Sequence, residues 1–225
     1  MKILLLRLEG LLQSWGDHSR WDHRDSADLP TKSGVIGLLG CAMGLPRGDD
    51  RLKTLADGLK MAVRADRMGV IMTDFHTVQS RIGSMFTAEG KTKKNGDTLV
   101  TPREYLQDAC YTVFLTGDEA LLLECSEALR HPVWVPCLGR RSCPPSRPIL
   151  PVMTDEFETF DEAVQAFRWD APAVVRQNGK MRAEIEDSMG EKELNDQPVD
   201  SSAYRYAKRR VRIVYTENGG EAACS

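Results

Sequence analysis

The sequence predicts an α+β fold, because segments with strand patterns alternate with segments with helical patterns along the first 150 residues. The chain has 225 residues, 41% of them hydrophobic, so it is long enough to bury a full core. Three observations carry the prediction. These are an aliphatic run at the N-terminus, apolar or amphipathic helical segments, and short segments that alternate apolar with polar residues.

The first two elements are a buried strand and a buried helix. Residues 3–8 form a nearly continuous aliphatic run, typical of a strand buried on both faces. Residues 35–43 are apolar enough for a buried helix, which Thr31 or Ser33 can cap. Glycine costs about 1 kcal/mol against alanine inside a helix, so glycines here indicate close packing or ligand approach. One helical face carries Gly34, Gly37, Gly40 and Gly44.

The following elements complete a strand, helix, strand, strand, helix order. They are a short helix capped by Asp49 or Asp50, a strand over 61–65, extended segments over 70–78 and 98–101, a strand over 109–115, and a helix that ends before Pro132. Between the extended segments, residues 87–97 are polar and basic, with an Asn-Gly turn signal. They predict a projecting hairpin that is either disordered or ordered by a partner.

If a segment near residues 148–152 closes the sheet, this order is ferredoxin-like, the layout of RNA-recognition-motif domains. The predicted body spans residues 1–150, and residues 151–225 form a smaller, less regular segment that packs on it. The acidic excess of the chain lies in this second part, where residues 176–203 are expected to be a mobile acidic loop. A capping box at Thr159 and Glu162 predicts a short helix, and residues 209–215 predict a late strand.

The composition narrows the classes of function. A net charge of −3 disfavours a protein that coats nucleic acid non-specifically. The six cysteines form no C-x-x-C pair and no signal-peptide pattern is present, so we expect a reduced, cytoplasmic protein without a membrane span. His18 and His23 are five residues apart, which does not suit a metal site on a helix. No metal and no cofactor is expected.

Three strings are candidates for RNA contacts. Trp15 follows the first strand and can stack on a base, although a loop tryptophan folded onto the core is as good an interpretation. Lys32 and its neighbours at a helix start offer a cradle for a phosphate, although helix capping alone also explains them. Arg140 and Arg141 lie between Gly139 and a rigid proline pair, which can hold two guanidinium groups ready for phosphates.

A catalytic alternative remains open at this stage. Metal-independent RNA cleavage has imaginable participants in His76, Tyr105, Lys32 and Lys91, but no pattern assembles them. His76 can equally be a strand residue that faces a partner.

Five strings occur together in the order of one family: Leu12-Gln13-Ser14-Trp15-Gly16, the run from Pro30 to Gly40, Asp74-Phe75-His76-Thr77-Val78, Arg103-Glu104-Tyr105-Leu106, and the run from Leu138 to Pro144. Over residues 1–150 the chain thus resembles the CasD family, the type I-E CRISPR Cascade subunits that cap the 5′ handle of the CRISPR RNA. Beyond residue 150 the resemblance is slight.

The resemblance implies a ferredoxin-like body with a protruding thumb over residues 74–103. The partners would be CRISPR RNA, the Cascade backbone subunits and the large subunit, with target DNA reached through the assembly. Relatives of type I-C cut the precursor RNA themselves, so a metal-independent endoribonuclease is the alternative. The implied RNA contacts are Gln13, Trp15, Lys32, Ser33, Gly34, His76, Gly139, Arg140 and Arg141, and the implied thumb contacts are Arg81, Lys91, Lys93, Lys94 and Arg103.

Overall fold

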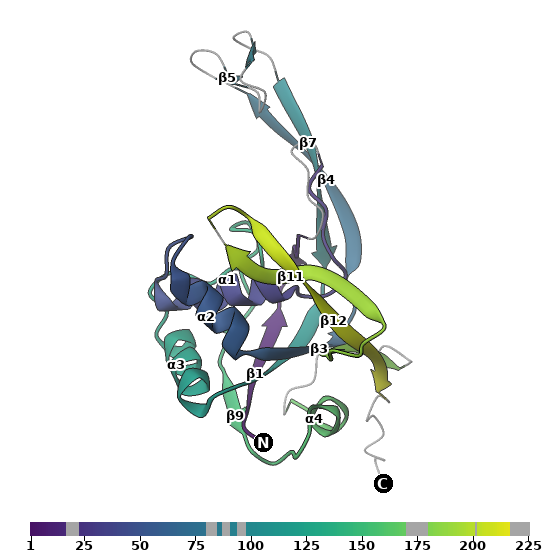
Figure 1. Cartoon of the computed structure of the whole chain (residues 1–225). Coiled ribbons are helices and arrows are strands. Elements are labelled where there is room, and N and C mark those ends of the chain that lie inside the picture. The colour runs from purple at the N-terminus through teal and green to yellow at the C-terminus, as the bar shows by residue number, and fades with distance from the viewer. Residues whose placement is uncertain are drawn as a thin grey trace.

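One antiparallel sheet of seven strands organises the protein in the computed structural model (Figure 1). The structure describes residues 1–16, 23–79, 85–86, 91–93, 98–169, 180–200 and 202–216, without the side chains at 85, 86, 92 and 93. Across the sheet the order is β11 (Lys192–Asp200), β12 (Arg205–Thr216), β10 (Met181–Glu186), β3 (Lys60–Arg67), β8 (Cys110–Thr116), β1 (Ile3–Glu9) and β9 (Val152–Thr154). Every neighbouring pair is antiparallel.

Helices cover both faces of this sheet. On one face lie α1 (Lys32–Met43), α2 (Asp50–Gly58) and α3 (Glu119–Arg130), and on the other lies α4 (Phe160–Ala166). Side chains cap the four starts, with Thr31, Asp49, Asp118 and Thr159 each accepting a backbone N–H. Thr31, Asp49 and Thr159 were among the caps predicted from the sequence. The described part of the chain has no helix long and apolar enough to cross a membrane.

The N-terminal strand is buried on both faces, as its aliphatic run predicted. Leu4, Leu6 and Leu8 pack with the three helices, whereas Ile3 and Leu5 pack in the smaller core beside α4. An aliphatic run suits β1 because helices cover the sheet on both sides of it, so that neither face of the strand reaches solvent.

The atoms that lie closest to the glycines of α1 belong to side chains, not to another backbone. A Cβ on Gly34 would lie 2.7 Å from the Trp15 ring, and one on Gly40 would lie 2.4 Å from Leu52. Gly44 is the C-cap, with φ 72°. A Cβ on Gly37 would meet no atom within 4 Å. Of the four glycines, therefore, only Gly37 leaves an open surface.

A long hairpin rises from the body (Figure 1). Its strands β4 (Val70–Gln79) and β7 (Thr98–Gln107) pair in register over their whole length, and β2 (Leu12–Gln13) adds to β7 at the base. The short strands β5 (Met85–Phe86) and β6 (Thr92–Lys93) pair with each other at the far end. The second extended segment is therefore longer than the 98–101 expected from sequence.

The C-terminal part is more regular than the sequence predicted. Residues 181–186 and 192–200, expected to belong to a mobile acidic loop over 176–203, are strands β10 and β11. With β12 they extend the sheet past β3, so one sheet crosses the expected boundary at residue 150. The expected loop was wrong because basic side chains neutralise these acids: Glu184 pairs with Arg182 and Lys192, and Asp196 pairs with Arg209. Residues 176–179 and 201 lie outside the described residues.

Candidate nucleic-acid interface

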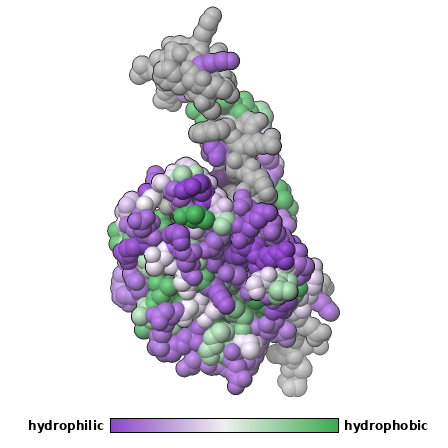
Figure 2. All heavy atoms as spheres, in the orientation of Figure 1, coloured by the Kyte–Doolittle hydropathy of each residue, from purple (hydrophilic) through white to green (hydrophobic). Residues whose placement is uncertain are grey.

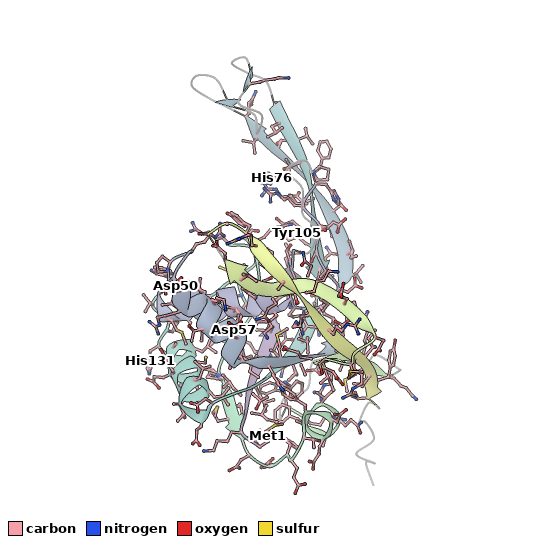
Figure 3. All side chains as sticks on the ribbon, in the orientation of Figure 1. Met1, Asp50, Asp57, His76, Tyr105 and His131 are labelled. Atoms are coloured by element: carbon pink, nitrogen blue, oxygen red, sulfur yellow. The ribbon has the colours of Figure 1, made fainter. Side chains whose placement is uncertain are left out.

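The base of the hairpin is where the predicted site residues converge. Backbone hydrogen bonds tie β7 to the segment around Arg24, whose N–H donates to Pro102 O at 2.9 Å. The loop over residues 138–143 joins the same corner, because Ser14 N–H donates to Leu138 O at 3.1 Å. Figure 3 labels Tyr105 in this corner, with His76 farther out along the hairpin.

Arg140 fastens the loop to the hairpin. Its Nη1 donates to Glu104 O at 2.9 Å and its Nη2 donates to Arg24 O at 3.1 Å. The guanidinium carbon also lies 4.7 Å from the centre of the Tyr105 ring, within range of a cation–π contact. Two donors of the planar fork are thus committed within the protein, and the side chain is half-buried.

Gly139 sets the path of this loop. Its φ is 89°, and a Cβ at this position would lie 1.7 Å from Ser14 O. The turn closes through Cys143 N–H donating to Arg140 O at 2.9 Å and Leu138 N–H donating to Cys143 O at 2.8 Å. Only glycine permits both this backbone conformation and this approach.

Arg141 is the member of the pair that faces solvent. It is exposed, and within the described residues its guanidinium makes no recorded hydrogen bond or ion pair. Its charge reaches Cys41 on α1: burial and the neighbouring Cys137 raise the pKa of the Cys41 thiol, and Arg141 lowers it. The contacts agree, because Val135 O accepts from both Cys41 Sγ and Cys137 Sγ, and Cys137 Sγ lies 3.9 Å from Arg141 O. The loop with Arg141 therefore meets α1 at Cys41, and the outward positions along this helix are Ser33, Gly37 and Cys41.

Gln13 and Trp15 lie inside the protein, contrary to their expected RNA contacts. Gln13 is fully buried; its Nε2 donates to Leu8 O and Ala109 O, and its Oε1 accepts from Trp15 Nε1 at 3.1 Å. Trp15 is 1% exposed and its ring lies against Gly34. The alternative interpretation, a tryptophan folded onto the core, is what the structure contains, because Gly34 leaves space for the ring.

Lys32 is also enclosed, and a carboxylate of the chain itself occupies the expected phosphate cradle. Lys32 N–H donates to Asp196 Oδ2 at 2.7 Å, and Lys32 Nζ lies 3.1 Å from Glu186 Oε2. The side chain is 3% exposed, and burial lowers its pKa although Glu186 opposes that shift. Arg209 binds the same Asp196 through two nitrogens. An open polar pocket of about 500 Å³ lies over this ion-pair group.

The hairpin carries the remaining predicted contacts. His76 is half-exposed, with Nδ1 3.5 Å from Asp74 Oδ2, and Arg103 Nε donates to Thr101 Oγ1 at 3.3 Å. Lys91 is exposed. The predicted contacts Arg81 and Lys94 lie outside the described residues, as does the side chain of Lys93.

The imagined catalytic residues are not brought together. His76 pairs across the hairpin with Thr101, and Tyr105 pairs with Met72 four positions along, which separates them by about 13 Å along the strands. The Tyr105 hydroxyl lies 3.4 Å from Ser142 Oγ at the base, and Lys32 is committed to Glu186. These side chains therefore do not share a point at which one reacting group could sit.

Trp134 is an exposed aromatic residue that was not among the candidates predicted from the sequence. It lies in the segment between α3 and the 138–143 loop, and 47% of it is exposed. Its neighbours Val133 and Val135 are also exposed. The available signal was the apolar run between Pro132 and Pro136, since prolines on both sides prevent it from joining a helix or a central strand.

Comparisons with known proteins agree on one family. Over residues 3–212 the chain matches the model of the family described as CRISPR-associated protein (Cas_Cas5). It is 37% identical over 159 residues to the CRISPR system Cascade subunit CasD of Escherichia coli (strain K12), covering 65% of this chain and 69% of that protein. Its fold matches a chain of a solved structure titled "CRISPR RNA-guided surveillance complex", with a TM-score of 0.74, 37% identity, and 95% of this chain and 90% of that chain covered. A second structure, "Crystal structure of Cas protein", gives a TM-score of 0.69 and 34% identity, with 95% and 94% covered.

Proposed function

Because this chain belongs to the CRISPR-associated Cas5 family, we propose that it is a non-catalytic subunit of an RNA-guided Cascade surveillance complex. In this proposal it binds the 5′ handle of the CRISPR RNA and caps one end of the backbone filament. The similarity to a surveillance-complex chain over 95% of this chain supports the proposal, because it includes the C-terminal strands as well as the body.

We place the RNA site at Arg141 because this side chain is exposed on a loop that the rest of the protein holds in place. Gly139 and Arg140 fix the loop from two sides, so that Arg141 stands exposed on a loop of fixed path. An exposed guanidinium is suited to phosphate because its donors form a planar fork. One helical turn before Cys41, which the Arg141 loop meets, the open surface at Gly37 lets an RNA backbone come close to α1. The handle would thus lie along Ser33, Gly37 and Arg141.

We assign the other expected contacts by their exposure. Gln13, Trp15 and Lys32 stabilise the body and act on RNA only by shaping its surface, because they are enclosed by protein. Gly34 is half-buried and makes space for the Trp15 ring. His76 and Arg103 remain candidates for contact along the hairpin, together with the exposed Lys91. This division fits a net charge of −3, because a few local cations suffice when RNA is held inside an assembly.

We further propose that the body is ferredoxin-like and that the hairpin is a thumb. The strand order β9, β1, β8, β3 and the antiparallel pairing support the first assignment. The second is supported by hydrophobic side chains on the hairpin, some of which are visible in Figure 2. By the register of the two strands, the exposed Ile71, Phe75 and Val100 lie on one face. Such a face suits contact with an adjacent backbone subunit, and the thumb would kink the guide–target duplex there.

The decisive experiment compares Arg141→Ala with Arg205→Ala in the full-length chain. Both side chains are exposed, but Arg205 lies at the start of β12. We expect Arg141→Ala to weaken binding to RNA carrying the 5′ handle, measured by filter binding at fixed salt, and Arg205→Ala to bind like the wild type. Equal affinity of both variants would remove Arg141 from the site.

Two further measurements test the class of function. Binding of unrelated RNA with equal affinity and a steep salt dependence would indicate a general single-strand binder instead. Incubation with the repeat RNA in the absence of metal tests for cleavage. Cleavage at a single site that His76→Ala abolishes would show an endoribonuclease and overturn the non-catalytic proposal.

A further inference from the structure

The backbone at the exposed Trp134 is hydrogen-bonded to α1. Its N–H donates to Cys41 O at 3.3 Å, and the preceding Val133 N–H donates to Ala42 O at 2.8 Å, so the segment is bonded to the last turn of α1. Val133 also covers the C-cap Gly44, where a Cβ would lie 2.8 Å from its Cγ1. The segment begins after His131, which Figure 3 labels at the end of α3. Hydrogen bonds and packing therefore order the segment around Trp134, although the core does not cover the Trp134 side chain.

The same corner of the surface holds Arg141. Val135 O accepts from Cys41 Sγ at 3.5 Å and from Cys137 Sγ at 3.7 Å, and Cys137 Sγ lies 3.9 Å from Arg141 O. The segment with Trp134 and the loop with Arg141 therefore meet around Cys41 and Cys137. Trp134 and Arg141 are both exposed, and the two segments that carry them meet at the end of α1.

An aromatic residue beside a cation matches the chemistry of single-stranded RNA. Unpaired bases stack on aromatic side chains while neighbouring cations bind the phosphates. A docked protein is a poorer match, because a stable protein interface buries roughly 800 Å² on each partner. The apolar part of this patch is only three residues, Val133, Trp134 and Val135, and Val133 is partly used against Gly44.

We propose that Trp134 stacks on an unpaired base of the RNA whose backbone Arg141 binds. The inference rests on the proposed function and adds a base-contacting residue to it. It commits to a nucleobase as the occupant of the patch. Since every base has a π-face, the contact would hold one nucleotide in place without reading its identity.

The test combines substitutions at Trp134 with abasic RNA. Trp134→Leu keeps an apolar side chain without a π-face, whereas Trp134→Phe keeps a smaller ring. We expect Trp134→Leu to lose roughly five- to a hundred-fold in affinity for handle RNA, and Trp134→Phe to lose much less. A series of RNAs, each lacking one base, should contain one that weakens the wild type by a similar factor. That RNA should bind Trp134→Leu no more weakly than intact RNA does.

The controls separate this inference from the proposed function. Tyr215→Leu removes another exposed aromatic residue, on β12, and should leave RNA affinity unchanged. If Arg141→Ala weakens binding while Trp134→Leu binds like the wild type, the stacking proposal fails and the RNA site stands. If both variants bind normally, both proposals fail. Thermal unfolding of each variant must match the wild type, and Trp134→Phe provides the folded reference if Trp134→Leu does not.

Discussion

Replacing Arg140 with alanine should destabilise the protein, whereas the same change at Arg141 should not. Arg140 donates to Glu104 O and Arg24 O from a charged group, and such bonds are each worth about 1.5–3 kcal/mol when fully desolvated. The side chain is only half-buried, so water replaces part of this. Both carbonyls also keep another donor, because Glu104 O accepts from Ser14 Oγ and Arg24 O accepts from Glu104 N–H. A third, longer bond from Nη2 to Asp25 O at 3.3 Å is lost as well. Because Glu104 O and Arg24 O stay hydrogen-bonded, the net loss, with the Tyr105 contact included, is about 2 kcal/mol.

The assay is thermal or urea unfolding followed by circular dichroism. For a chain of this size about 2 kcal/mol corresponds to a fall of roughly 4–8 °C in Tm. Arg140→Lys should fall nearly as far, because an ammonium cannot donate to two carbonyls with the planar fork of a guanidinium. Arg141→Ala is the matched control and should stay within about 0.5 kcal/mol of the wild type. A normal Tm for Arg140→Ala, or an equal loss for Arg141→Ala, would refute the conclusion that Arg140 stabilises the fold and Arg141 does not.

Three other substitutions test the loop turn at Gly139 and the carboxylates Asp196 and Asp200. Gly139→Ala should lower the free energy of unfolding by about 3 kcal/mol in total, which is more than the loss expected for Arg140→Ala, because the new Cβ would overlap Ser14 O. Unchanged urea unfolding would contradict this. Asp196→Asn should lower the urea midpoint, since it leaves the enclosed Arg209 with only the more distant carboxylate of Glu186, at 3.7 Å; an Asn variant as stable as the wild type would mean that Glu186 alone compensates the arginine. Hydrogen bonds from Ser202, Ala203 and Arg205 hold the pKa of Asp200 below its ordinary 3.8. A lowered pKa means that the unfolded chain binds the proton more tightly, so this contribution to stability is present above about pH 4 and is lost as the pH falls further. The unfolding free energy measured from pH 6 to pH 3 should therefore fall less steeply in Asp200→Asn, and identical slopes would show that this carboxylate has no role in acid sensitivity.

Local patterns were enough to predict the central elements. The run over residues 3–8, the capping residues Thr31 and Asp49, and the alternation over 61–65 each specify a strand or helix without long-range information. The late strand over 209–215 was also predicted and is part of β12, whereas β10 and β11 were missed for the opposite reason. Their acidic side chains look solvated in the sequence, and only the folded sheet brings Arg182, Lys192 and Arg209 beside them.

The cradle at the start of α1 shows how chemistry can be predicted without its partner. A helix N-terminus with Thr31 and Lys32 does attract an anion, as the sequence indicated, but the anion is Asp196 of the same chain. No local pattern links positions 164 residues apart, so an external phosphate was the natural interpretation. The distinction matters for experiments, because substituting Lys32 or Asp196 would weaken RNA binding through the stability of the body.

The two tryptophans show that tertiary packing decides which aromatic residue is exposed. Trp15 follows a strand in a string typical of its family, and its surroundings in sequence suit a ligand, yet Gly34 and Gln13 enclose it. Trp134 stands between prolines in a segment with no regular structure, yet it is exposed beside Arg141. Exposure depends on whether the fold provides a neighbour without a side chain, such as Gly34, and that property belongs to tertiary packing. Surface chemistry at this corner should therefore follow Trp134 and Arg141, while changes at Trp15 should act through the stability of the body.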